Sequence, residues 1–112
     1  MNVTRTPPQQ PSVKSMFVNA SSLGATQVMA AQTSAKIRVI SAALVATGAT
    51  TVKFQSAATD ISATFPLGAN GGLVMSFNEH GWFETNPGEA LNVNLGTATA
   101  TGVQLNYIVI NV

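Results

Sequence analysis

Apolar and polar residues alternate along most of the chain after Val13. The alternation is clearest in four segments, residues 51–55, 61–67, 73–77 and 91–95. Residues at positions i and i+2 of a β-strand lie on the same face, so each segment presents one apolar and one polar face. A helix needs apolar spacings of three and four, which these segments lack. The pattern therefore predicts antiparallel strands with one face on a core and the other in water.

Turn-forming residues separate these segments. Glycine-containing stretches lie at 47–49 and 68–72, and Asn86-Pro87-Gly88 suits a type II turn because proline fixes φ and glycine adopts a positive φ. About nine short strands punctuated in this way are typical of a sandwich or barrel. We expect an all-β fold, an antiparallel, jelly-roll-like β-sandwich formed by residues 13–112. The alanine-rich segment 23–32 stays open between a strand and a short helix.

A long strand predicted within 36–46 changes its alternation midway. Its apolar residues occupy odd positions in the first half and even positions in the second half. We expect a hairpin that turns at Gly48 and places Leu44 opposite Val52, both facing inward. The inward face then changes parity near Ile40-Ser41, which predicts a β-bulge or a bend there.

The last predicted strand has a different pattern at its end. It alternates through Val103, Leu105 and Tyr107, and it is then continuously apolar over residues 108–110. A continuous apolar run is typical of a strand that is covered on both faces. Either the domain itself or a neighbouring subunit provides that cover.

Residues 1–12 differ from the rest of the chain. Their three prolines and two glutamines disfavour both a helix and a central strand. We predict an extended N-terminal arm, which is either a loose terminus or a segment laid along a partner. In the second case the candidate partner-binding residues of the arm are Arg5, Pro7, Pro8 and Pro11. The prolines also interrupt the apolar stretch that a secretion signal would need.

The composition points away from several classes of partner. Charged residues make up 8% of the chain, against about 25% in an ordinary soluble domain. Such a surface is tolerable where partners cover it, although a neutral coat of Ser, Thr and Asn would give the same composition. The net charge is +1 and the basic residues form no run, so neither nucleic acid nor an anionic membrane is an expected partner. There is no cysteine for a disulfide or a thiolate site.

Candidate catalytic residues are few. His80 is the one histidine, and the acidic residues Asp60, Glu79, Glu84 and Glu89 are scattered. No nucleophile motif of the form Gly-x-Ser-x-Gly accompanies them, and one histidine makes a poor zinc site. We therefore expect no catalytic residue, no metal site and no cofactor.

Trp82 and Phe83 are adjacent aromatic residues. On a strand they must point to opposite faces, so one fills the core and the other faces outward. Aromatic side chains are common anchors of protein interfaces. Both residues are therefore candidates for partner binding, and the sequence leaves open which of them faces outward.

Several segments resemble small jelly-roll proteins that decorate the capsids of tailed bacteriophages, the cement or staple proteins such as those of the epsilon15-like short-tailed phages. The resemblance covers residues 20–112 and is carried by these segments: Lys36-Ile37-Arg38-Val39, Thr51-Val52-Lys53-Phe54, Gly71-Gly72-Leu73-Val74, Gly81-Trp82-Phe83-Glu84-Thr85 and Pro87-Gly88-Glu89-Ala90-Leu91. It implies a non-enzymatic virion protein on the outer surface of the capsid. Such a protein bridges subunits of the major capsid protein, stabilises the shell and forms a homodimer or homotrimer.

Two other functions remain open. Jelly rolls also host lectins, so the chain could be a receptor- or carbohydrate-binding module of a phage appendage. An enzyme of the cupin type would need a cluster of metal ligands, to which this sequence contributes one histidine.

Overall fold

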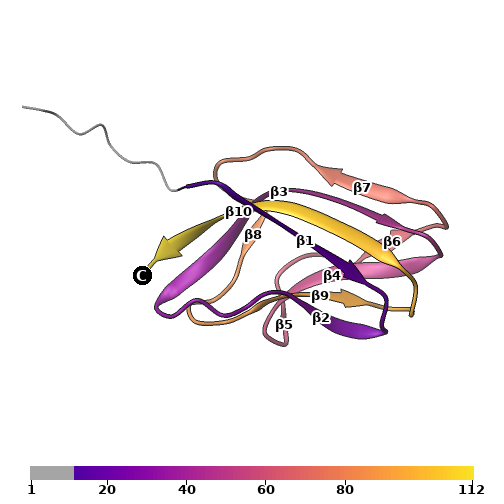
Figure 1. Cartoon of the computed structure of the whole chain (residues 1–112), viewed down its shortest axis with the longest axis horizontal. Coiled ribbons are helices and arrows are strands. Elements are labelled where there is room, and N and C mark those ends of the chain that lie inside the picture. The colour runs from indigo at the N-terminus through magenta and orange to yellow at the C-terminus, as the bar shows by residue number, and fades with distance from the viewer. Residues whose placement is uncertain (1–11) are drawn as a thin grey trace, which may run out of the picture.

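Strands from both halves of the chain build two antiparallel sheets that pack face to face (Figure 1). The computed structural model describes residues 12–112, so the arm residues Arg5, Pro7, Pro8 and Pro11 lie outside the described residues. Sheet A has the order β1 (Lys14–Ala20), β10 (Thr101–Asn111), β3 (Ala35–Ala46), β7 (Gly72–Met75), and β8 (Phe83–Glu84) also pairs with β3. Sheet B has the order β2 (Gly24–Met29), β9 (Leu91–Leu95), β4 (Thr50–Ser56), β5 (Thr59–Asp60), and β6 (Phe65–Leu67) also pairs with β4.

The chain crosses repeatedly between the two sheets. The successive strands β1 and β2, β3 and β4, and β9 and β10 belong to different sheets. This winding is that of a jelly roll, and the predicted antiparallel β-sandwich is confirmed. The segment 23–32 contains β2, so a short helix there is wrong. Among the described residues no helix is long and apolar enough to span a membrane.

The predicted hairpin between Leu44 and Val52 is wrong. Leu44 pairs with Val103 and Leu73 in sheet A, whereas Val52 pairs with Leu95 and Phe65 in sheet B. The Thr47 N–H donates to the Ala100 carbonyl at 2.9 Å. This bond holds the residue after β3 beside the start of β10, at the point where the chain leaves sheet A. Leu44 and Val52 both face inward, as predicted. They lie on opposite sheets on either side of the core and are not paired within one sheet.

The predicted bulge in β3 is confirmed. Asn106 of β10 pairs with Ser41 and the next residue, Tyr107, pairs with Val39, so Ile40 is an extra residue. This insertion exchanges the inward and outward positions of β3. Ile37 and Val39 are therefore buried on one side of it, and the even-numbered residues of 42–46 are buried on the other.

The predicted strand over residues 61–67 is shorter than its alternation indicates, since β6 contains only Phe65–Leu67. The preceding residues Ile61 and Ser62 bond instead to Phe54, inside β4. The Phe54 N–H donates to Ser62 Oγ at 2.8 Å, and the Ile61 N–H donates to the Phe54 carbonyl at 3.0 Å. A side-chain acceptor thus takes the place of a ladder bond at this point.

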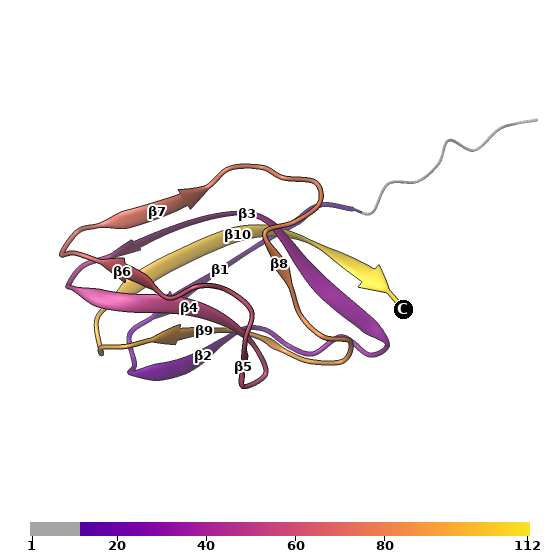
Figure 2. The same cartoon turned by 180° about the vertical axis from the view of Figure 1, so that it is seen from behind.

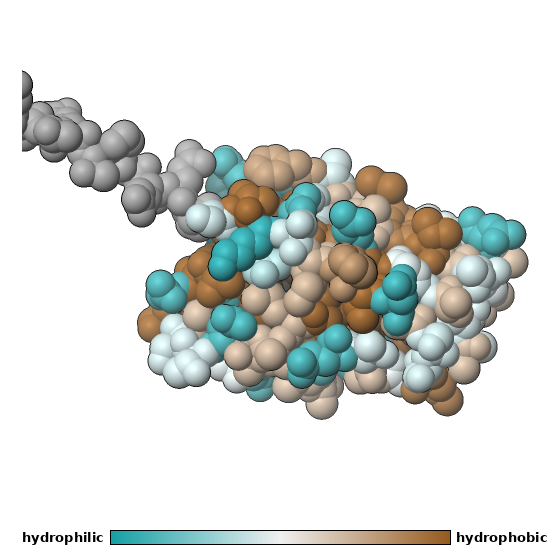
Figure 3. All heavy atoms as spheres, in the orientation of Figure 1, coloured by the Kyte–Doolittle hydropathy of each residue, from teal (hydrophilic) through white to brown (hydrophobic). Residues whose placement is uncertain are grey.

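The core lies between the two sheets, and its largest fully buried side chain is that of Phe54. The Phe83 ring stacks on it with ring centroids 4.8 Å apart. At the edge where β1 and β2 lie in front, apolar residues are visible in the centre and toward both ends, with hydrophilic residues interspersed among them (Figure 3). At the end of β10, Ile108 is buried by the domain itself, whereas Val109 and Ile110 are only partly buried.

Candidate protein-binding face

A row of outward side chains crosses sheet A from edge to edge. Phe17 of β1 pairs with Gln104 of β10, Gln104 pairs with Ala43 of β3, and Ala43 pairs with Val74 of β7. All four residues are exposed, with Phe17 at 70% and Val74 at 77%. The two large apolar side chains therefore stand at the two ends of the row.

The neighbouring rows are also uncharged. We call the whole surface the outer A face and define it by these outward residues: Ser15, Phe17, Asn19, Ser41, Ala43, Val45, Gly72, Val74, Phe77, Gly102, Gln104 and Asn106. None of these residues has an ionisable side chain. The polar ones are satisfied partly by one another, since Asn106 Nδ2 donates to Ser41 Oγ at 2.9 Å.

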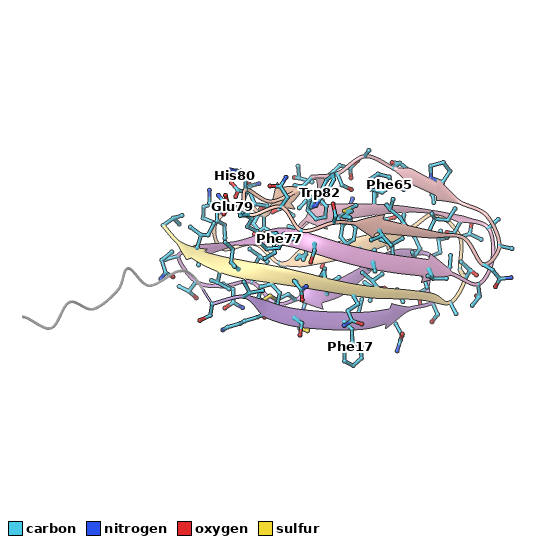
Figure 4. All side chains as sticks on the ribbon, turned by 90° about the horizontal axis from the view of Figure 1, so that it is seen from above. Phe17, Phe65, Phe77, Glu79, His80 and Trp82 are labelled. Atoms are coloured by element: carbon cyan, nitrogen blue, oxygen red, sulfur yellow. The ribbon has the colours of Figure 1, made fainter. Side chains whose placement is uncertain are left out.

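The outer A face contains two shallow hollows. One is lined by Phe17, Val45 and Gly102, and the other by Ala43, Val74, Phe77 and their neighbours. Small residues such as Ala43 and Gly102 line the hollows together with the large apolar side chains. Figure 4 looks onto sheet A, with Phe17 at the β1 edge and with Phe77 and Trp82 toward the opposite side. Such a surface can receive the side chains of a partner.

The outer face of sheet B has the opposite character. Lys53 Nζ lies 3.1 Å from Asp60 Oδ1, and Gln55 Nε2 donates to the same carboxylate at 2.8 Å. These hydrogen bonds, first that of Gln55 and then that of Lys53, lower the pKa of Asp60. Asn94 Nδ2 donates to Gln55 Oε1 at 3.3 Å. Sheet B therefore presents a hydrogen-bonded polar surface suited to water.

A second charged group lies beyond the bulge of β3. Glu84 of β8 accepts hydrogen bonds from Lys36 Nζ at 2.8 Å and from Arg38 Nε at 3.0 Å. The Lys36 bond, followed by that of Arg38, lowers the pKa of Glu84 against the opposing effect of burial. Because the bulge at Ile40 changes the parity of β3, Lys36 and Arg38 point to the same side of sheet A as Ala43 and Val45. The charged cluster therefore lies on that side of the sheet, beyond the end of the outer A face.

The structure settles the orientation of Trp82 and Phe83. Phe83 is partly buried against Phe54, whereas Trp82 is 48% exposed. The Trp82 indole Nε1–H donates to the Ser76 carbonyl at 2.7 Å, and Ser76 lines the same hollow as Phe77. Trp82 therefore borders the outer A face, while Phe83 contributes to the core.

The titratable residues do not gather into a reactive group. His80 is exposed in the connection from β7 to β8, with Glu79 3.8 Å away. Within residues 12–112, no three His, Cys, Asp or Glu residues are grouped so that they could hold a metal ion. Glu89 accepts a 2.6 Å hydrogen bond from Ser56 Oγ, which with that from Asn86 lowers its pKa. The Glu89 contacts join the Asn86–Gly88 turn to β4.

Sequence reasoning missed the four large apolar residues of the outer A face. Val45 and Val74 lie on strands between residues that point inward. The sequence could have revealed them as apolar residues at positions where the alternation expects a polar one. The same holds for Phe17 in β1. Phe77 was expected to share the inward face of Leu73, but β7 ends at Met75 and Phe77 is 67% exposed.

Comparisons of the chain with protein-family models, with curated proteins and with solved structures each found no match.

Proposed function

We propose that this chain is a structural protein that binds other protein subunits through the outer A face. Its site of action in this proposal is the outer surface of a phage capsid, where it bridges subunits of the major capsid protein and stabilises the shell. The observation that carries the proposal is the uncharged outer A face, on which Phe17, Val45, Val74 and Phe77 are 55–77% exposed.

The size and chemistry of this face support a protein partner. Four strands at about 4.8 Å spacing and five residues at about 3.3 Å rise cover roughly 300 Å² in projection. The largest exposed apolar patch of an ordinary monomer measures about 300–600 Å² and is often functional, and the apolar side chains of this face are spread among uncharged polar ones over an area at the lower end of that range. The centres of interfaces are depleted of charged residues and enriched in aromatic ones, as this face is. Trp82, at its border, supplies a further anchor of the type common in interfaces.

The proposed mechanism is thermodynamic coupling between binding of this chain and assembly of the shell. A protein that binds only the assembled shell stabilises it by its binding free energy. A capsid offers the same site many times, and a copy that contacts two subunits holds both, so moderate individual affinities suffice. Catalysis has no part in this mechanism.

Co-sedimentation tests the proposal. Purified chain is mixed with decoration-free capsids of the source phage, both expanded and unexpanded, and pelleted through a cushion. Saturable, stoichiometric pelleting with expanded capsids and a raised capsid melting temperature are expected. Absence of the chain from both pellets at tens of micromolar would contradict the proposal.

One observation favours a second candidate function, carbohydrate binding. The exposed Trp82 follows the polar residues Asn78, Glu79 and His80 in the connection from β7 to β8, and an exposed aromatic ring with polar neighbours in its loop is a surface on which a sugar ring can stack. A glycan array that gives hits with the wild type and none with Trp82→Ala would establish this function in place of capsid binding.

A further inference from the structure

Within residues 12–112, the last residues of β10 form an open strand edge. β1 begins at Lys14, opposite Tyr107, so among the described residues 108–111 pair with β3 alone. Figures 1 and 2 show from opposite sides that the start of β1 and the end of β10 diverge. The space beside this part of β10 is therefore not taken by β1.

The hydrogen-bond register fixes which backbone groups point to this edge. The Val112 N–H donates to the Ser34 carbonyl at 2.9 Å, so even-numbered residues at the end of β10 direct their N–H and C=O groups toward β3. Successive residues of a strand alternate in this respect. Val109 and Asn111 therefore direct their N–H and C=O groups toward the open edge.

The edge lacks the features that usually block strand addition. Residues 108–112 contain no charged side chain, no proline and no bulge. Natural proteins protect edge strands with such features because an open edge is a template for pairing with another strand. Ile110 is partly buried and Val112 is 63% exposed, so apolar side chains accompany the free backbone groups.

We propose that this edge pairs with the same edge of a second copy across a two-fold axis. Val109 of each copy then lies opposite Asn111 of the other, and the two Ile110 residues face each other on the axis. Each hydrogen-bonded antiparallel pair exchanges two bonds, so this register forms about four main-chain hydrogen bonds. Sheet A becomes continuous across the two copies. The inference does not depend on the proposed capsid function.

The edge itself argues for a second copy as the occupant. A two-fold contact brings identical surfaces together, so it needs an edge that is complementary to itself. Val109 and Asn111 are placed symmetrically about Ile110, and both carry the backbone groups that point outward. A charged side chain close to the axis would meet its own copy with like charge, and none of the side chains of residues 108–112 is charged.

Cysteine cross-linking of the full chain tests this pairing. Facing residues of a non-hydrogen-bonded antiparallel pair have Cα atoms about 4.5 Å apart, which lies within the range that a disulfide spans. The chain has no cysteine of its own, so Ile110→Cys introduces a single thiol. Val74→Cys on the outer A face and Leu23→Cys in the β1–β2 turn are the controls, since both positions are well exposed.

Under mild oxidation we expect Ile110→Cys to form a covalent dimer at least tenfold faster than either control. Adding Asn111→Pro removes one edge-facing N–H, and we expect it to slow the cross-link at least fivefold. Thermal unfolding under reducing conditions checks that each variant is folded. Equal rates for Ile110→Cys and the controls would overturn the proposal. A cross-link that appears only after residues 1–11 are deleted would also overturn it, by showing that the arm occupies the edge.

Discussion

Trp82 and Phe83 are neighbours in sequence, but replacing each by alanine should have different consequences for stability and for binding. Phe→Ala at a fully buried site costs about 3–5 kcal/mol. Phe83 is only partly buried, but it loses a ring stacked at 4.8 Å on Phe54, and such pairs add about 0.5–1.5 kcal/mol. We therefore expect Phe83→Ala to lower the free energy of unfolding by about 2–3 kcal/mol.

Trp82→Ala should cost much less stability. The side chain is 48% exposed and makes one hydrogen bond, to the Ser76 carbonyl, and a hydrogen bond contributes about 0.5–1.5 kcal/mol. We expect a total loss of about 1 kcal/mol together with weaker partner binding, because Trp82 borders the outer A face.

Urea unfolding followed by circular dichroism separates the two variants. With an m-value of about 1–1.5 kcal/mol/M, the midpoint should fall by about 2 M for Phe83→Ala and by less than about 1 M for Trp82→Ala. Equal shifts, or a larger shift for Trp82→Ala, would refute the assignment of Phe83 to the core and Trp82 to the surface.

Three further predictions concern the elements that frame the outer A face. The lowered pKa of Glu84 means that its bonds to Lys36 and Arg38 stabilise the fold above its unfolded pKa of about 4.3, and that this contribution is lost as pH falls through the lower folded value. Glu84→Gln should make the fall in thermal stability between about pH 5 and pH 3 shallower without abolishing it, because the pKa values of Asp60 and Glu89 are lowered as well. Gly81 has a φ of +84°, and an added Cβ would contact the Arg38 side chain, so Gly81→Ala should cost about 1–3 kcal/mol; unchanged unfolding would contradict this. Deleting Ile40 should abolish cooperative unfolding, because residues 36–39 would turn their apolar side chains outward; a cooperative melt near that of the wild type would show that the bulge is dispensable.

The period-two alternation was sufficient to predict the sandwich, because an inward apolar face is a local property of each strand. The bulge at Ile40 was predictable for the same reason, since the change of parity lies within one segment. The pairing of strands was not predictable in this way. Leu44 and Val52 both face the core, and alternation alone does not distinguish a hairpin from two strands in opposite sheets.

The candidate binding face was only partly predictable. An adjacent pair of aromatic residues on a strand indicates that one faces outward, but it was the contact between Phe83 and Phe54 that identified Trp82 as the exposed one. The outer A face draws residues from four strands that lie far apart in the sequence. Phe17 and Val74 are separated by 57 positions and become the ends of one row only through the registers of β10 and β3.

The most direct test of the account places a charge at the centre of the outer A face. Ala43 is exposed between Gln104 and Val74, so Ala43→Arg adds a charge to the face without disturbing the core. Leu23→Arg, in the exposed β1–β2 turn, is the matched control. In co-sedimentation with expanded capsids we expect wild type and Leu23→Arg to bind alike and Ala43→Arg to bind at least 30-fold more weakly, all three with the same melting temperature within about 2 °C. Equal binding by Ala43→Arg and wild type would contradict the claim that this face is the one that binds.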